Sequence, residues 1–454
     1  MRAFGKLKAD LSMPALRTDA AEKSPGPVRR IYQNLGLLLG GKAAAGLISL
    51  VYVVAAARIL GPEQYGVLVL VNYFAMLVGG LVAFPGWHAI VRYGVQPAQN
   101  DHAKLIRLLR FVGAIELLAG LVAVIVAALA VPIVGPLLGW SADAQALAIP
   151  YCFAVLATVR ATPGGYLQIL RRFDLLALHN VVTPIMRLLG TFVVIVFDLG
   201  LTAFLVAWLV AALVEGVSLW IAAIYLARRH MLDQPLLGAV ADARREHEGL
   251  GRFMLTANAD IMLGDLTGRL TPLIVGAMLG PAAAGLYSIA HRATIVISQP
   301  AQILGQAAYA ELARLAAADG AKTAIRHALA RCVGIALATA LPLVVILAFF
   351  SHEIAVLIGG PAFAGAAAVM IWLTLAKVLA MAGPPTSAAL IALGHPGLSV
   401  AGNLVAGLGL LPLLPLFTNS AGLAGAGYLA ILQAVVAAGL LGLALWRVTA
   451  SHSA

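Results

Sequence analysis

The chain has 454 residues, of which 62% are hydrophobic and only 11% are charged. Soluble globular proteins are about 45–50% apolar and about 25% charged, so the composition argues against a soluble enzyme, a disordered chain and a disulfide scaffold. The formal net charge of +11 would suggest a nucleic-acid partner in a soluble protein, but in a membrane protein basic residues first report topology. The sequence therefore predicts an all-α polytopic membrane protein.

Twelve apolar stretches follow one another along the chain, each long enough to cross a bilayer core of about 30 Å as a helix. They lie at 33–57, 67–86, 109–134, 147–168, 180–197, 201–227, 253–279, 284–308, 329–350, 364–383, 398–418 and 422–446. Residues 1–32 are polar and lack the apolar core of a signal peptide. We expect them to form a cytoplasmic N-terminal tail, with an interfacial turn around Leu11–Leu16, and residues 447–454 to form a cytoplasmic C-terminal tail.

The distribution of Lys and Arg predicts the orientation, because cytoplasmic loops carry an excess of both. Of the 30 basic residues, 23 fall in the two tails and the even-numbered loops, and only Arg58 falls in an odd-numbered loop. This split predicts that both termini lie in the cytoplasm, and it accounts for most of the positive charge. Nucleic-acid binding is therefore not expected.

The two halves of the chain repeat each other. Leu60-Gly61-Pro62 with Gly66 follows the first span, and Leu279-Gly280-Pro281 with Gly285 follows the seventh, at an offset of 219 residues. Three further matches occur in the same order: Leu137-Leu138-Gly139 with Leu357-Ile358-Gly359, Gly200-Leu201 with Gly422-Leu423, and Asn180 with Asn403.

This duplication predicts two six-helix bundles, 33–227 and 253–446, joined by a cytoplasmic connector at 228–252. Leu236-Leu237 in the connector suggests a short interfacial helix. Because six spans is an even number, both halves enter the membrane in the same direction, and a pseudo-twofold axis along the membrane normal relates them. Such a plan is typical of alternating-access transporters; the alternative is a structural or receptor-like membrane protein.

Several motifs in order resemble a known family. Asn34 to Gly41 enters the first span, Ala57-Arg58-Ile59-Leu60-Gly61-Pro62-Glu63-Gln64-Tyr65-Gly66 follows it, and Arg92-Tyr93 follows the second. Leu167-Gln168 and Arg172-Phe173 close the fourth span, and Gly285-Leu286-Tyr287-Ser288 leads to Ala310-Glu311-Leu312-Ala313-Arg314. This order resembles the polysaccharide-export branch of the multidrug/oligosaccharidyl-lipid/polysaccharide (MOP) exporter superfamily.

The resemblance covers nearly the whole chain and implies a V-shaped pair of bundles of MOP/MATE type. It implies a flippase that moves an undecaprenyl-pyrophosphate-linked oligosaccharide from the inner to the outer leaflet for exopolysaccharide, capsule or O-antigen synthesis. The bilayer and this lipid-linked oligosaccharide would be its partners, together with a polysaccharide polymerase and export machinery. No cofactor is implied, and coupling to a proton or sodium gradient or to the membrane potential stays open.

Ionisable residues inside spans are costly and are candidates for function. Lys42, Arg269 and Arg292 would meet across a lumen and bind pyrophosphate, because clustered cations and bidentate Arg suit that group. Asp260 and Asp265 in the seventh span are candidates for ion coupling, since Asp265 and Arg269 are spaced to pair on one helix face. The alternative for this last pair is a self-neutralised structural contact.

The eighth span carries a polar stripe at helical spacing: Ser288, Arg292, Gln299, Gln302 and Gln306. We interpret the stripe as a lumen lining, with a hydrogen-bonded helix seam as the alternative. The other buried charges read as structural: Glu116 with Arg160 or Arg187, or Glu215 with Arg187, would form ion pairs in the first bundle. Lys377 would extend to the interface.

Neither a nucleophile–base constellation nor a metal-spaced Cys/His cluster occurs in the sequence, so we expect neither an enzyme nor a metal site. Two other functions stay open. A multidrug or small-cation exporter of the same superfamily would favour acidic and aromatic lumen groups, against which six cations and four acids inside the spans argue mildly. A non-transporting scaffold of a glycan synthase is the third possibility.

Overall fold

The computed structural model describes residues 27–82, 86–230, 246–247, 249–316 and 321–451. Every regular element within these residues is a helix, as the composition predicts. The expected tail turn at Leu11–Leu16 and the expected connector helix at Leu236-Leu237 lie outside the described residues.

The first half contains one very long helix and several shorter ones around it. Its elements are α2 (Pro27–Val82), α3 (Trp87–Gly94), α4 (Pro97–Asn100), α5 (His102–Leu137), α6 (Ala142–Tyr151), η1 (Cys152–Thr158), α7 (Ala161–Ile169), α8 (Phe173–Val196) and α9 (Leu201–His230). Helix α2 contains two predicted spans, and the non-helical backbone of Gly61 (φ 67°, ψ 176°) separates one from the other.

The second half follows the same order with more interruptions. Its elements are α11 (Leu250–Leu279), α12 (Pro281–Ile295), η2 (Val296–Ser298), α13 (Gln299–Ala316), α14 (Ala321–Phe349), α15 (Ser351–Gly359), η3 (Pro361–Phe363), α16 (Ala366–Leu379), η4 (Ala380–Ala382), α17 (Gly383–Ala392), α18 (Pro396–Leu404), η5 (Val405–Gly409), η6 (Leu411–Leu413), α19 (Leu414–Ala421) and α20 (Leu423–Ser451).

The twelve predicted spans coincide with helices. Nine helical stretches of the described residues are long and apolar enough to cross a membrane, judged by length and composition. One of them contains the first two spans, and α11 and the α12–α13 pair occupy the seventh and eighth. The prediction of an all-α polytopic protein with two bundles is confirmed.

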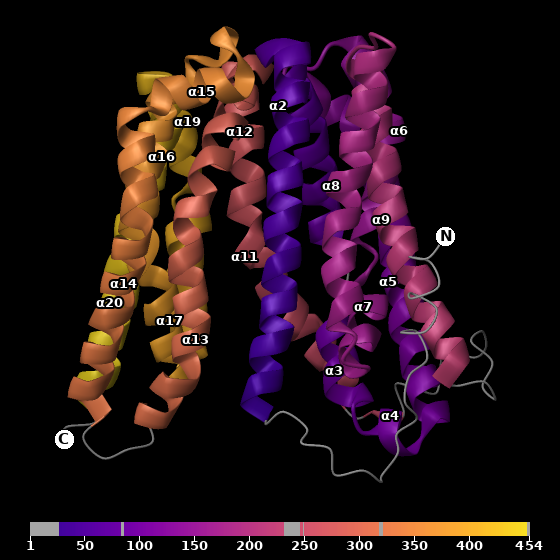
Figure 1. Ribbon diagram of the computed structural model, residues 1–454, viewed down its shortest axis with the longest axis vertical. Helices are drawn as coiled ribbons and strands as arrows, with labels where there is room; N and C mark the ends of the chain where they lie inside the picture. The colour runs from indigo at the N-terminus through magenta and orange to yellow at the C-terminus, as the bar shows by residue number, and fades with distance from the viewer. Residues whose placement is uncertain (1–26, 83–85, 231–245, 248, 317–320, 452–454) are drawn as a thin grey trace, which may run out of the picture.

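The two halves form a V (Figure 1). They meet at the end of the molecule where α15 lies beside α2, and they diverge toward the opposite end (Figure 1). We call the meeting end the turn end, because Gly61 lies there beside α15 and Pro281 contacts Gly66. Gly280 (φ 85°, ψ 171°) repeats the backbone conformation of Gly61, a conformation essentially restricted to glycine. The repeat seen in the sequence is therefore also a repeat in backbone geometry.

The turn end is closed by direct contact between the repeated segments. A Cβ on Gly66 would lie 1.8 Å from the carbonyl oxygen of Pro281, and a Cβ on Gly285 would lie 2.6 Å from that of Pro62. Tyr65 and Phe363 stack edge to face across the halves, with ring centroids 5.9 Å apart. Only glycine permits such a close approach of two backbones, so the equivalent glycines hold the halves together here.

Candidate functional site

A cavity of about 420 Å³ is lined by residues of both halves. Most of its wall comes from the first half, and Leu266 and Arg269 of α11 close it from the second half. Its polar or charged lining residues are Trp87, Thr158, Arg160, Gln168, His179, Asn180 and Arg269. We call it the inter-half cavity.

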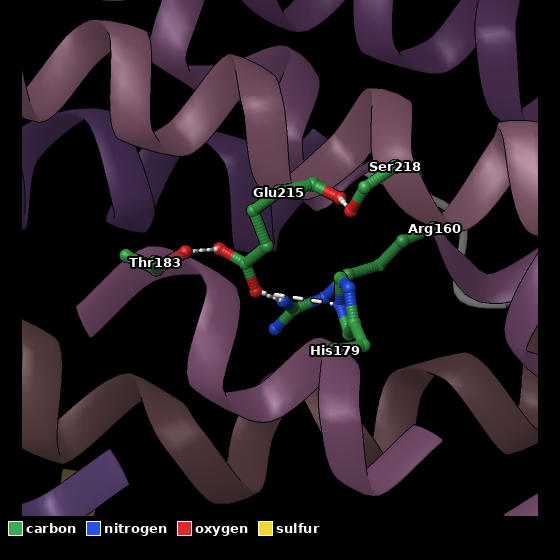
Figure 2. A network of polar contacts seen from close by, with 5 residues as sticks. All are labelled: Arg160, His179, Thr183, Glu215 and Ser218. Carbon is green, nitrogen blue, oxygen red and sulfur yellow. Dashed lines mark hydrogen bonds and ion pairs between the residues drawn. The ribbon is translucent and has the colours of Figure 1, made fainter. Parts of the chain in front are cut away.

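A half-buried carboxylate behind this cavity, Glu215, organises a polar network, drawn in Figure 2. Arg160 contacts Glu215 Oε1, and His179 Nε2 lies 3.4 Å from the same oxygen. Thr183 Oγ1 donates to Glu215 Oε2 at 2.5 Å. The Arg160 side chain is 49% exposed while that of Glu215 is 17% exposed, so the cation faces the cavity and the acid anchors it from behind. The predicted pair of Glu215 with Arg187 is wrong, because Arg160 holds that carboxylate.

Glu116 pairs with the backbone and not with an arginine. Its Oε1 accepts the main-chain N–H of Ala161 at 2.5 Å and its Oε2 that of Thr162 at 2.8 Å. These two donors open α7, where the first N–H groups of a helix have no partner within the helix. The predicted ion pair of Glu116 with Arg160 or Arg187 is therefore wrong, because a helix start provides the positive partner.

Arg187 of α8 points toward aromatic and amide groups of the first half. Its guanidinium donates to Asn72 Oδ1 at 3.2 Å and to the Tyr52 hydroxyl at 3.4 Å. Its Cζ also lies 4.0 Å from the centroid of the Trp208 ring, a cation–π contact. Tyr151 donates to the same Asn72 oxygen at 2.8 Å.

Arg292 of α12 approaches the same tyrosine from the second half, within electrostatic reach of the Tyr52, Tyr65 and Tyr73 hydroxyls. Tyr52 is nine residues from Gly61 and Arg292 is eleven from Pro281, so both lie roughly 13–17 Å below the turns. Neither Arg187 nor Arg292 has an acidic partner among the side chains that the structure describes. We call these two residues the arginine pair.

The predicted lumen cations are only partly gathered at one depth. Arg269 Nη1 donates to the main-chain oxygen of Met76 and covers Gly80. Lys42 is exposed on α2, and Lys42 and Gly80 each lie 19 residues from Gly61, roughly 28 Å by helical rise. Arg269 is eleven residues from Gly280, as Arg292 is from Pro281, but its guanidinium reaches Gly80 at the level of Lys42, whereas Arg292 lies at the level of Tyr52, beside Arg187.

The polar stripe of the eighth span divides into two environments. Ser288 is fully buried and lies beside the Tyr65 hydroxyl, whereas Gln299 and Gln302 are exposed. The side chains of Gln306, Asp260 and Asp265 lie outside the described part of the structure, so the ion-coupling hypothesis stays a prediction.

The sequence analysis did not identify Arg187 as a site residue. Its span also contains an asparagine and a proline, and this combination could have marked the arginine as a candidate.

The chain is similar to several known proteins. A family model described as "Polysaccharide biosynthesis protein" matches residues 55–368. The Escherichia coli K12 protein named "Inner membrane protein YghQ" is 28% identical over 291 residues, which cover 64% of this chain and 82% of that protein.

Two solved structures share the fold. One is an inward-facing multidrug resistance MATE family transporter of the MOP superfamily, with a TM-score of 0.66 at 17% identity; the match covers 90% of this chain and 96% of the transporter. The other is the lipid II flippase MurJ in an inward closed conformation, with a TM-score of 0.69 at 14% identity; the match covers 91% of this chain and 87% of MurJ. The first is named as a transporter and the second as a flippase.

Proposed function

Because this chain belongs to the polysaccharide biosynthesis protein family of the MOP superfamily, we propose that it is a flippase for a lipid-linked oligosaccharide. The proposed substrate is an undecaprenyl-pyrophosphate-linked repeat unit, which passes from the inner to the outer leaflet for exopolysaccharide, capsule or O-antigen synthesis. A polysaccharide polymerase and export machinery would act on the flipped product. The protein would lie in a bacterial inner membrane with both termini in the cytoplasm.

The arginine pair carries this proposal. Arg187 and Arg292 come from opposite halves, flank Tyr52, and have no acidic partner among the described side chains. A charge inside a membrane protein costs several kcal/mol unless it is compensated, so the pair is suited to an anion that arrives from outside. A diphosphate has the charge and the acceptor oxygens that two guanidinium groups can bind.

The inter-half cavity supplies a cationic route toward this pair. Arg160, the guanidinium of Arg269 at Gly80, and the exposed Lys42 lie nearer the diverging end of the halves than the arginine pair does. If both termini lie in the cytoplasm, the closed turn end faces the periplasm. This conformation then accepts substrate from the cytoplasmic side. The inner leaflet is where a lipid-linked precursor would meet these cations first.

The test is translocation of a fluorescent undecaprenyl-pyrophosphate oligosaccharide in proteoliposomes. A charge-assisted hydrogen bond is worth about 1.5–3 kcal/mol, so Arg187→Ala and Arg292→Ala should each lower the initial rate by roughly 10- to 150-fold. Lys at either position should retain an intermediate rate, because it keeps the charge but not the bidentate geometry. Arg331→Ala is the control, since Arg331 is exposed on α14.

Wild-type rates in both arginine variants would contradict the role of the pair. Absence of lipid-linked sugar movement in the wild-type protein would favour the scaffold hypothesis. Export of organic cations without movement of the lipid-linked sugar would favour the multidrug or small-cation exporter. Varying the proton gradient, the sodium gradient and the membrane potential in the same vesicles would identify the driving force.

A further inference from the structure

A second cavity, of about 350 Å³, lies inside the second half. Among the described residues that line it, Lys377 of α16 is the only charged one, and the polar ones are Ser298, Gln302, Ser387 and Asn403. Gln302 and Asn403 are exposed, so the cavity is reached from outside the bundle. We call it the Lys377 cavity.

The backbone is irregular on three of the spans that border this cavity. The 3-10 segment η2 precedes α13, the 3-10 segment η4 separates α16 from α17, and the π-helical segment η5 follows α18. At membrane depth, non-helical backbone is tolerated where it is buried in protein or lines a cavity. Interrupted helices often build the binding sites of transporters, and π-helical turns are frequent at functional sites.

The Lys377 cavity is the repeat-related counterpart of the inter-half cavity. Asn180 and Asn403, which are 223 residues apart, line the first and the second cavity, and four further pairs line them at the same offset. They are Thr158 and Met381, Arg160 and Gly383, Ala161 and Pro384, and Gly164 and Ser387. Both cavities thus form where the fourth span of a half is interrupted.

The two cavities differ in how their charge is balanced. In the first half Glu215 neutralises Arg160, whereas the residues 222 and 223 positions after Glu215 are Ala437 and Ala438, and both line the Lys377 cavity. Lys377 forms no ion pair or hydrogen bond within the part of the chain that the structure describes. Lys377 and Arg292 both lie within electrostatic reach of His291. The surroundings of Lys377 therefore contain a further positive charge.

We propose that the Lys377 cavity binds a small, singly charged anion, either a halide ion or a carboxylate group. One ammonium balances one negative charge, and the amides and hydroxyls of Gln302, Asn403, Ser298 and Ser387 supply neutral donors around it. The structure places the Lys377 side chain in this cavity and not at the interface where the sequence suggested it would extend, and a nearby anion would stabilise its charged form there. The inference is independent of the identity of the transported substrate.

The experiment measures ³⁵Cl NMR line width for the purified full-length protein in detergent, with sodium chloride as the probe. The wild-type protein should broaden the line, and Lys377→Met should lose most of the protein-specific broadening. Arg331→Met removes an exposed positive charge and should keep the broadening. Titration with sodium glucuronate distinguishes the two sources, since displacement shows that the cavity accepts a carboxylate.

Ala438→Glu is the decisive second variant because it keeps Lys377. The new carboxylate stands where the first half has Glu215 and should pair with the ammonium, so chloride broadening should fall at least about fivefold while the elution volume and melting temperature stay near wild type. Broadening that persists in both Lys377→Met and Ala438→Glu would overturn the proposal, as would a wild-type protein that broadens the line no more than a detergent blank. Should Lys377→Met fail to fold, Ala438→Glu alone decides between these outcomes.

Discussion

The close approach of Gly66 to Pro281 makes a quantitative prediction about how the two halves separate. In a Gly66→Ala variant, the new Cβ would lie 1.8 Å from the carbonyl oxygen and 2.4 Å from the carbonyl carbon of Pro281. Both atoms are backbone, so no side-chain rotation relieves the clash. The start of α12, which belongs to the other half, must move by about 1 Å or more.

The cost falls on one conformation only. Inserting a methyl group into a tightly packed contact costs about 1–3 kcal/mol. A conformation in which the halves have separated at the turn end does not make this contact and does not carry the cost. The equilibrium should therefore shift by roughly 5- to 150-fold toward separation of the halves at the turn end.

Crosslinking across the turn end measures this shift. Arg58 Nη2 donates to the main-chain oxygen of Leu357 at 2.5 Å, so cysteines at these two positions should react with a short bismaleimide once the two native cysteines are replaced by serine. Gly66→Ala should slow the crosslinking, and Gly46→Ala should not, because a Cβ on Gly46 meets no atom within 4 Å. Equal rates in both variants would show that the turn contact does not hold the halves together.

Three further predictions concern stability in detergent. Glu116→Gln should lower stability by about 1–3 kcal/mol, because the amide cannot accept both N–H groups at the start of α7; the exposed Glu353→Gln is the control in the same thermal unfolding assay. Burial lowers the pKa of His247, so its protonation opposes folding and stability should fall as the pH drops below about 6.5. His247→Gln should reduce the difference in melting temperature between about pH 8 and pH 5.5, and an unchanged difference would assign that dependence to other groups. Gly280→Ala should cost about 1–3 kcal/mol by backbone strain at φ 85°, whereas Gly268→Ala, inside α11 with open space at its Cβ, should not destabilise the protein.

The fold was predictable from the sequence because its main determinants are local. Apolar stretches of membrane length mark the spans, and the repeated Leu-Gly-Pro segments mark the two turns that the structure places at Gly61 and Gly280. Neither inference requires knowledge of which residues face each other. The close packing of the turns on one another was not predicted, since it depends on the angle at which the halves meet.

The polar partners were harder to predict because they depend on helix rotation. Extrapolating 100° per residue along the fourth span fails, since η1 and the non-helical Val159 and Arg160 interrupt it. The interruption directs Arg160 to Glu215 and leaves Arg187 to the aromatic groups around Tyr52. A local break thus decides which arginine is neutralised.

The stripe on the eighth span fails as a single face for the same reason. Three residues of 3-10 helix advance by about 120° each, so η2 displaces everything after it by roughly 60° relative to an uninterrupted α-helix. Ser288 before the break is buried, and Gln299 and Gln302 after it are exposed. The amino acids on this span were correctly identified as polar, but their common orientation could not follow from spacing alone.

The arginine pair links the motion of the halves to the proposed transport step. Arg187 is carried by the first half and Arg292 by the second, and Tyr52 lies between them. Both lie roughly 13–17 Å from the turns, so separation of the turn end increases the distance between the two guanidinium groups. A diphosphate held by both would then lose one of its two partners, and its affinity would fall as the turn end opens. Conditions that favour separation, including Gly66→Ala, should therefore weaken binding of a diphosphate-linked sugar without changing either arginine; unchanged binding in that variant would show that the two arginines do not act together.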